Sequence, residues 1–256
     1  MIPIPEVVIG EDGPEWLAQA CRLFGELTSQ AVRMRGRCIV ALSGGSTPKA
    51  LYHGLTAPEW RSSCPWDRIT FLFGDERCVP PDHAESNFAV AKRALFEPLA
   101  IPAERIHRMK GETDDPAGAA RDYERDLRRL TACPPPLVPR LDLVLLGIGE
   151  DGHTASLFPS TPTLHEYTQL VTVSQSPKGI ATRLTLTLGV INRATVVLFL
   201  VSGPGKAPVV RSVLRPQTQA DRALPAALVK PETGRLIWLL DRSAALQIRE
   251  GESTGE

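Results

Sequence analysis

The stretch RCIVALSGGSTP at Arg37–Pro48 places a short apolar run directly before a loop of glycine, serine and threonine. An apolar run of this length, bounded by turn residues, is typical of a buried strand. Pro48 suits the first position of a helix, and Thr47 suits the residue that caps it. A strand, a glycine loop and a helix in this order form the repeating unit of an open α/β sheet.

Three further apolar runs end in polar loops of the same kind. They are FLFGDER at Phe71–Arg77, LLGIGEDGH at Leu145–His153 and FLVSGPGK at Phe199–Lys206. In an open α/β sheet, the loops that leave the carboxyl ends of parallel strands converge on one crevice, where ligands bind. We therefore expect the four loops to meet in one site.

The rest of the chain alternates short apolar runs with helical patterns. The expected strands are Glu6–Ile9, Arg37–Leu42, Ile69–Phe73, Leu141–Leu146, Gln169–Val173, Leu184–Leu188, Thr195–Val201 and Arg235–Leu240. The expected helices are Pro14–Met34, Ser86–Leu95, Pro116–Leu130 and Lys206–Leu214. The sequence thus predicts a single Rossmann-like α/β domain over residues 1–256, with a mostly parallel open sheet, helices on both faces and a polar tail at 251–256.

Composition restricts the possible partners and the cellular compartment. Lys plus Arg and Asp plus Glu are both 29, so no overall field attracts nucleic acid or an anionic membrane. The apolar runs are far shorter than the ~20 residues of a membrane helix, and the first residues lack the basic region of a secretory signal. The cysteines show no C-x-x-C pairing, which suits a reducing compartment; they are Cys21, Cys38, Cys64, Cys78 and Cys133. We therefore expect a cytoplasmic protein.

Two of the glycine loops have the features of an anion site. Around Gly44, Gly45, Ser46 and Thr47, the backbone can turn sharply and present free N–H groups at a helix start, which favours phosphate. An ordinary tight turn is the alternative. The loop is not a Walker A motif, because its lysine follows proline and no serine or threonine comes next. Lys206, just past another strand, could add a point charge to the same anion.

The remaining loops carry candidate catalytic groups. An imidazole at His153 can take a proton from water near neutral pH, and a nearby carboxylate can orient it. The sequence leaves open whether this carboxylate is that of Asp151 or that of Asp75. Asp75 could bind substrate hydroxyls, and Arg77 could bind an anion or pair with Asp75. Arg183 is a weaker candidate for the anion. A structural or surface role is the alternative for each of these residues.

Several other kinds of site fit poorly. The segment Gly147–Gly152 matches the G-x-G-x-x-G dinucleotide pattern, but prolines follow soon after it where a helix should begin. A metal site built from Asp75, Glu76, Asp82 and His83 has no supporting ligand spacing. The usual serine hydrolase is excluded because no G-x-S-x-G elbow is present.

Taken together, the loops resemble the 6-phosphogluconolactonase family of the aminosugar-phosphate isomerase superfamily. The matching segments are SGGSTP, FGDER with Glu85-Ser86-Asn87, LLGIGEDGHTASLFP, RLTL from Arg183, and the Gly205-Lys206 segment. The resemblance covers nearly the whole chain, and GxGxDGHxASLFP at Gly147–Pro159 is its most specific part.

The resemblance implies hydrolysis of 6-phosphoglucono-δ-lactone in the oxidative pentose phosphate pathway, without cofactor or metal. It places the general base at His153, assisted by Asp151. It places the phosphate site at Gly44, Gly45, Ser46, Thr47, Arg183 and Lys206, and further substrate contacts at Asp75, Arg77 and Asn87. Asn87 comes only from the resemblance. The expected partner is a small phosphorylated sugar lactone, with no nucleic acid or membrane, and the chain would act as a monomer or small homo-oligomer.

Two rival functions share this scaffold. Aminosugar-6-phosphate deaminases are similar around the Gly-Asp-Gly-His segment but carry a glutamate five residues after the histidine, where this chain has Phe158. A phenyl ring cannot relay a proton, so water-mediated ester hydrolysis is favoured. A non-enzymatic sugar-phosphate sensor would be paired with a DNA-binding module, and the first expected strand begins at about Glu6, which leaves no room for one before it.

Overall fold

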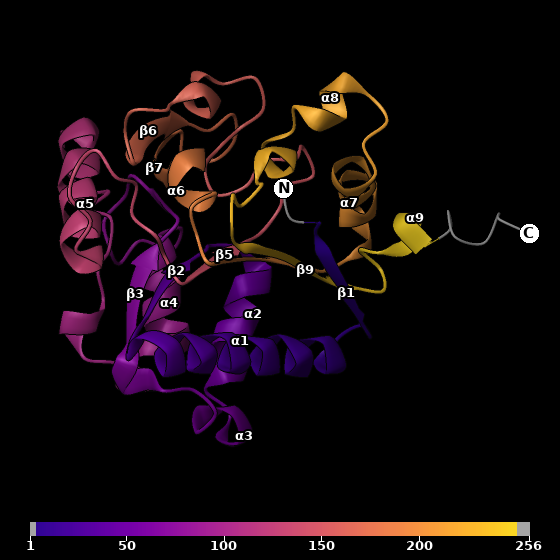
Figure 1. Cartoon of the computed structure of the whole chain (residues 1–256), viewed down its shortest axis with the longest axis horizontal. Coiled ribbons are helices and arrows are strands. Elements are labelled where there is room, and N and C mark those ends of the chain that lie inside the picture. The colour runs from indigo at the N-terminus through magenta and orange to yellow at the C-terminus, as the bar shows by residue number, and fades with distance from the viewer. Residues whose placement is uncertain (1–3, 250–256) are drawn as a thin grey trace, which may run out of the picture.

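Six parallel strands form the main sheet, which crosses the middle of the view in Figure 1. The structure is a computed structural model that describes residues 4–249. The spatial order of the strands is β1 (Glu6–Gly10), β9 (Arg235–Asp241), β8 (Val196–Val201), β5 (Leu143–Leu146), β2 (Cys38–Leu42) and β3 (Ile69–Phe73). The predicted α/β fold with a mostly parallel sheet is confirmed. The predicted tail at 251–256 lies outside the described residues.

Successive residues of the central strands point to two different hydrophobic cores. In β2, Val40 and Leu42 belong to one core, while Ile39 and Ala41 belong to the other. Every residue of β2 is buried, because helices or a second sheet cover both faces. This explains why the strand has an unbroken apolar sequence rather than an alternating one.

Helices cover both faces of the main sheet, as predicted. The longer helices α1 (Pro14–Arg35) and α2 (Ser46–Leu55) lie below the sheet in Figure 1, and α5 (Pro116–Thr131) and α7 (Ala207–Leu214) lie above it. The shorter helices are α3 (Pro58–Arg61), α4 (Asn87–Ala91), α6 (Leu188–Ile191), α8 (Gln219–Arg222) and α9 (Leu246–Arg249). Within residues 4–249, no helix combines the length and apolar character needed to cross a membrane.

A second, antiparallel sheet was not foreseen. It contains β4 (Asp75–Arg77), β7 (Thr182–Leu186) and β6 (Val171–Gln175). Two of the expected strands belong to this sheet rather than to the main one, and β4 lies in a segment expected to be a loop. The chain leaves the main sheet at Gly74, whose N–H bonds to the Leu42 carbonyl while its own carbonyl accepts from Leu186. One glycine therefore connects the two sheets.

The start of α2 differs from the prediction. The helix begins at Ser46 and its N-terminal cap is Gly45, so Thr47 is not the capping residue and Pro48 is not the first helical position. Gly45 adopts a φ of 103°, a conformation that glycine takes far more readily than other residues. The chain therefore turns into the helix two residues earlier than the proline suggested.

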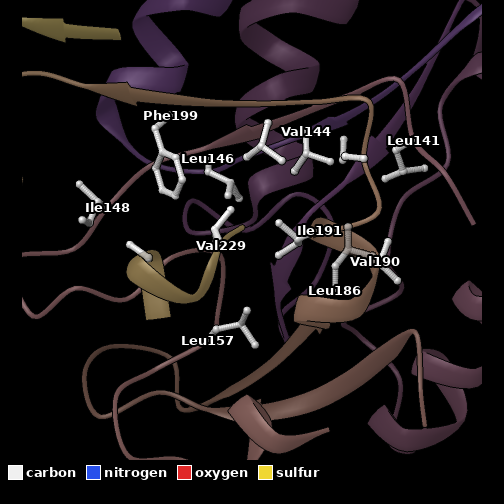
Figure 2. Close-up of a cluster of buried hydrophobic side chains, with 14 of the residues drawn as sticks. Leu141, Val144, Leu146, Ile148, Leu157, Leu186, Val190, Ile191, Phe199 and Val229 are labelled. Carbon is white, nitrogen blue, oxygen red and sulfur yellow. The ribbon is translucent and has the colours of Figure 1, made fainter. Parts of the chain in front are cut away.

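The predicted helix at 86–95 is also divided. Ser86 is the cap of α4, its side chain accepting from the Ala89 N–H, and the helix then changes at Lys92–Phe96 into a π-helical turn. The core that contains Ile39 and Ala41 of β2, called the upper core here, also includes Leu146 and Leu157, and Val229 lies between these two leucines in Figure 2. Because Leu157 follows the predicted catalytic loop closely in sequence, this core anchors that loop.

Candidate active site

A cavity of about 200 Å³ lies at the carboxyl ends of four adjacent strands, β8, β5, β2 and β3. All four glycine loops contribute to its wall, so the predicted convergence of these loops is confirmed. The lining residues are Ser43, Gly44, Gly45, Ser46, Thr47, Pro48, Asp75, Arg77, Gly147, Ile148, Gly149, His153, Ala155, Arg183, Leu200, Val201, Ser202 and Lys206. Of the predicted site residues, only Asp151 and Asn87 do not line it.

The first turn of α2 forms one side of the cavity. The first N–H groups of a helix have no acceptor within the helix, and here they lie in the cavity wall with Gly45, Ser46 and Thr47. The end of β2 is fixed by Tyr52, whose buried hydroxyl donates to the Ser43 carbonyl (2.6 Å) and accepts from the Ser43 N–H (3.0 Å). This wall therefore has the features that favour an anion: a glycine turn and the start of a helix, held in place by Tyr52.

Three cationic side chains, Arg77, Arg183 and Lys206, line the same cavity. Burial lowers the pKa of Arg183, and the neighbouring charge of Arg77 lowers it further. The Nε atom of Arg77 is buried and has no hydrogen-bond partner among the described residues. A bound anion would relieve both the repulsion between the two guanidinium groups and the unmet hydrogen bond.

Asp151 contacts His153 from outside the cavity. The His153 Nδ1 atom lies 2.6 Å from Asp151 Oδ1, which also accepts the His153 N–H at 3.2 Å. Burial by itself raises the pKa of Asp151, but these hydrogen bonds and the charge of His153 hold the pKa below its usual value. With Nδ1 donating to this carboxylate, the Nε2 atom is left free to accept a proton.

Asp75 has different neighbours from those of His153. It is 5% exposed and accepts hydrogen bonds from Asn87 Nδ2 at 3.0 Å and from Ser156 Oγ at 2.7 Å. The sequence left open whether Asp75 or Asp151 orients His153, and the hydrogen bond comes from Asp151. Nor does Asp75 pair with Arg77 among the described residues, since the Arg77 guanidinium donates to the Glu85 carbonyl.

Asn87 lies behind the loop of residues 44–47. Its amide donates to both the carbonyl and the carboxylate of Asp75. A Cβ atom added to Gly44 would overlap the Asn87 side chain, so the two residues are in close contact. Asn87 thus supports the cavity wall through Gly44 and Asp75.

Sequence reasoning missed several residues that hold the site together. Ser156 fixes Asp75, and the Ser202 hydroxyl lies 3.1 Å from that of Thr47, which connects the Lys206 loop to the α2 loop. Asp241 is buried and accepts from the Gly203 N–H at 2.8 Å. Both Ser202 and Asp241 are polar residues at or just after the end of a buried strand, and this signal could have identified them.

The alternative sites considered from the sequence lack their structural context. No helix begins directly after the segment 147–152, and the next helical turn is the short 3-10 helix at Pro162–His165, so the dinucleotide pattern is not in the setting that it needs. Within residues 4–249, no cluster of three His, Cys, Asp or Glu side chains could hold a metal ion, and Asp75, Glu76, Asp82 and His83 do not form one. The Phe158 ring packs against His153 with a centroid distance of 4.9 Å, at the position where deaminases have a glutamate.

Known proteins with this sequence pattern and fold are numerous. A family model for glucosamine-6-phosphate isomerases and 6-phosphogluconolactonase matches residues 11–238. A 6-phosphogluconolactonase of a Nostoc species is 42% identical, with 91% of this chain and 93% of the relative covered. The human 6-phosphogluconolactonase is 41% identical, with 87% and 88% covered.

Solved structures agree with this grouping. A 6-phosphogluconolactonase from Trypanosoma brucei superposes with a TM-score of 0.84 at 29% identity, covering 97% of this chain and all (100%) of that one. A monomeric glucosamine-6-phosphate deaminase, at 22% identity and a TM-score of 0.78, shares the fold. On the strength of the matched residues and of these relatives, the chain belongs to the family of glucosamine-6-phosphate isomerases and 6-phosphogluconolactonases.

Proposed function

We propose that the protein hydrolyses 6-phospho-D-glucono-1,5-lactone to 6-phosphogluconate, the lactonase step of the oxidative pentose phosphate pathway. One observation carries the proposal: His153, which Asp151 contacts at 2.6 Å, borders the same cavity as the first turn of α2 and the cationic side chains of Arg77, Arg183 and Lys206. The 6-phosphogluconolactonases among its relatives, at about 40% identity over most of the chain, support the same assignment.

In the proposed reaction, His153 is the general base. Its Nε2 atom takes a proton from a water molecule, whose oxygen attacks the lactone carbonyl carbon, while Asp151 stabilises the imidazolium that forms. The tetrahedral intermediate then collapses, the bond from this carbon to the ring oxygen breaks, and the ring oxygen takes the proton back from His153. The products are a carboxylic acid and a hydroxyl group, so no cofactor, metal or covalent intermediate is required by this scheme.

The phosphate group anchors the end of the substrate that does not react. A phosphate ester carries close to two negative charges at neutral pH. Backbone N–H groups of residues 44–47, together with Arg183 and Lys206, would hold it, while Asp75 and Arg77 would bind the sugar ring or its hydroxyls. Binding energy gained at the phosphate can then orient the lactone towards His153.

The ligand is, in this proposal, a small phosphorylated lactone that the chain binds as a monomer or small homo-oligomer, with no nucleic-acid or membrane partner. We also propose a cytoplasmic location. The five cysteines, all in the described part of the chain, are free thiols, which supports a reducing compartment. Fractionation of the native host, with activity assayed in each fraction, tests the location.

The deciding experiment uses freshly prepared lactone, because the substrate also hydrolyses spontaneously. We expect the purified protein to hydrolyse it far above the spontaneous rate, and His153→Ala to lower kcat by about 10²–10⁴-fold while product affinity changes little, since His153 acts on the reacting atoms. Binding of 6-phosphogluconate without any rate enhancement would contradict the proposal and favour a sensor. Release of ammonia from glucosamine 6-phosphate would favour a deaminase.

A further inference from the structure

A second groove lies at the opposite end of the main sheet from the candidate active site. It has a volume of about 310 Å³ and lies at the amino ends of β2 and β5, beside the carboxyl ends of α1 and α5. Its lining residues are Arg35, Arg37, Ile39, Thr131, Ala132, Cys133, Pro134, Leu137, Val138, Arg140, Asp142 and Arg193. A five-residue strand spans about 16 Å, so this groove is separate from the cavity at the carboxyl ends.

The groove has an excess of positive charge. Four arginines line it and only one carboxylate, that of Asp142. This carboxylate is already neutralised, because its Oδ1 atom lies 2.7 Å from Arg35 Nε and its Oδ2 atom accepts the Ile39 N–H at 2.7 Å. Asp142 is also buried, with 8% of its surface exposed, so it forms the floor of the groove rather than a free acidic group.

Two of the arginines keep their charge available. Arg37 makes no hydrogen bond and no ion pair with any residue in the described range 4–249. Arg140 donates through Nε to the neutral Thr195 hydroxyl at 3.1 Å, which leaves its two terminal nitrogens for a ligand. The charge of Arg193 is balanced by Glu232, whose Oε2 atom lies 2.9 Å from Arg193 Nη1. At least two guanidinium groups in the groove are therefore not balanced by a described carboxylate.

The wall of the groove also offers nonpolar surface. Leu137 is 58% exposed, and Pro134 and Val138 line the groove beside it, so the three side chains together form a nonpolar wall. Guanidinium groups bind phosphate through two parallel hydrogen bonds. A ligand that uses both features carries phosphate charges at one end and a ring at the other.

We propose that this groove is a second ligand site, which binds an organic phosphate with two or more negative charges. Its phosphates lie against Arg37 and Arg140, and its ring packs on Leu137. A nucleoside polyphosphate has this chemistry, and its volume suits a pocket of this size. Occupation of the groove would not compete with a ligand at the carboxyl ends of the strands.

The test is calorimetric titration with ATP and, separately, with inorganic pyrophosphate, in buffer without divalent cations. We expect ATP to bind more tightly than pyrophosphate, and the pair Arg37→Ala/Arg140→Ala to weaken ATP binding at least tenfold. Arg22→Ala/Arg93→Ala is the matched control, because it removes the same charge from exposed positions outside both pockets and should change affinity less than twofold.

Two further variants locate the binding. Lys206→Ala should leave ATP affinity unchanged, since Lys206 lines the other cavity, whereas Leu137→Ala should weaken binding of ATP but not of pyrophosphate. The proposal is wrong if the Arg37/Arg140 pair binds ATP as the control pair does, if Lys206→Ala abolishes binding, or if pyrophosphate binds as tightly as ATP. None of these outcomes depends on lactone hydrolysis.

Cys133, on the groove wall, gives a second measurement that does not rely on heat changes. Cys21, Cys38 and Cys64 are buried, so a thiol reagent applied to the Cys78→Ser variant reports chiefly on Cys133. We expect saturating ATP to slow its modification at least fivefold, and this protection to disappear in the Arg37→Ala/Arg140→Ala variant. A rate that ATP does not change would overturn the proposal.

Discussion

At the scale of single residues, the site depends on how closely His153 is held. Its ring is fixed on one side by Asp151, at 2.6 Å from Nδ1, and on the other by the face of Phe158. Gly149 lies beside both partners of this pair, since a Cβ atom added there would overlap the His153 ring and the Asp151 carboxylate. The ring of His153 therefore has little freedom to move, because Asp151, Phe158 and Gly149 surround it.

The first prediction concerns Gly149. Gly149→Ala should displace the His153 ring and lower kcat by at least tenfold, with the fold retained, because the added methyl group takes the space of the Nδ1 side of the ring. Gly189→Ala is the matched control, since a Cβ atom there makes only an ordinary contact of 3.7 Å with Thr187. Steady-state kinetics and circular dichroism of both variants check this prediction. A kcat for Gly149→Ala equal to that of Gly189→Ala would contradict it.

The second prediction concerns pH. The pKa of Asp151 is held below its usual value in the folded chain, so its share of stability is present above the unfolded-state pKa and is lost as the pH falls through the lower folded-state pKa. At neutral pH the carboxylate is ionised, and Asp151→Asn should lower kcat by a constant factor above about pH 8, where an ordinary histidine is neutral with or without this carboxylate. Unfolding measured from about pH 7 to 3 should show a constant difference in stability between the native chain and Asp151→Asn near neutral pH, which shrinks as the pH falls through about 4. A kcat ratio that changes steeply between about pH 8 and 9 would contradict this assignment.

At the scale of secondary-structure elements, the proposed anion site depends on the contact of two helix starts. The turn before α2 and the start of α4 meet where Gly44 touches Asn87, and Asn87 in turn holds Asp75 of β4. Glu76, the next residue of β4, accepts the N–H groups of Arg77, Asn87 and Phe88 and the hydroxyl of Ser86. The start of α4 is thus fixed to β4 by one buried carboxylate.

The third prediction tests this contact. Gly44→Ala should raise KM for the lactone at least tenfold, because the new methyl group overlaps the Asn87 amide and pushes the α2 turn out of place. In the Asn87→Ala background the same substitution should cost much less, since the overlapping side chain is gone. A double-mutant cycle on kcat/KM measures the difference. Additive effects would show that the two elements do not depend on this contact.

At the scale of the whole molecule, the site exists because the strand order is not the chain order. Strands β8, β5, β2 and β3 are neighbours in the sheet, although they come from four distant parts of the chain. The two cores keep these strands in place from opposite faces, and in the upper core the rings of Phe199 and Trp238 stack with centroids 3.9 Å apart.

The fourth prediction concerns this stack. Trp238→Ala should lower the free energy of unfolding by about 3–5 kcal/mol, because it leaves a cavity between β8 and β9. The value of kcat should change little at temperatures where the variant is folded, since Trp238 does not line the active-site cavity. Tyr167→Ala is the control, because Tyr167 is 80% exposed and its loss should cost less than about 0.5 kcal/mol. Chemical denaturation of both variants decides the matter.

Most strands and the longer helices could be predicted because local patterns determine them. The prediction for α1 is within one residue of the observed Pro14–Arg35, because a proline marks the start of the helix and a glycine marks its end. Local patterns could not place β4, because three residues with two carboxylates resemble a loop until β7 pairs with them. The start of α2 was misplaced because the φ angle of Gly45 cannot be inferred from the letters alone.

The sequence by itself determined the α/β fold, the four glycine loops and their meeting at one edge of the sheet, because apolar runs and glycines act locally and parallel strands align their ends. Only the tertiary structure decided that Asp151 rather than Asp75 holds His153, that Asn87 stands behind the cavity wall, and that an arginine groove forms at the far end. Those outcomes depend on distances between residues far apart in the chain, or on the conformation of one short loop, and the order of the amino acids does not fix either until the chain has packed.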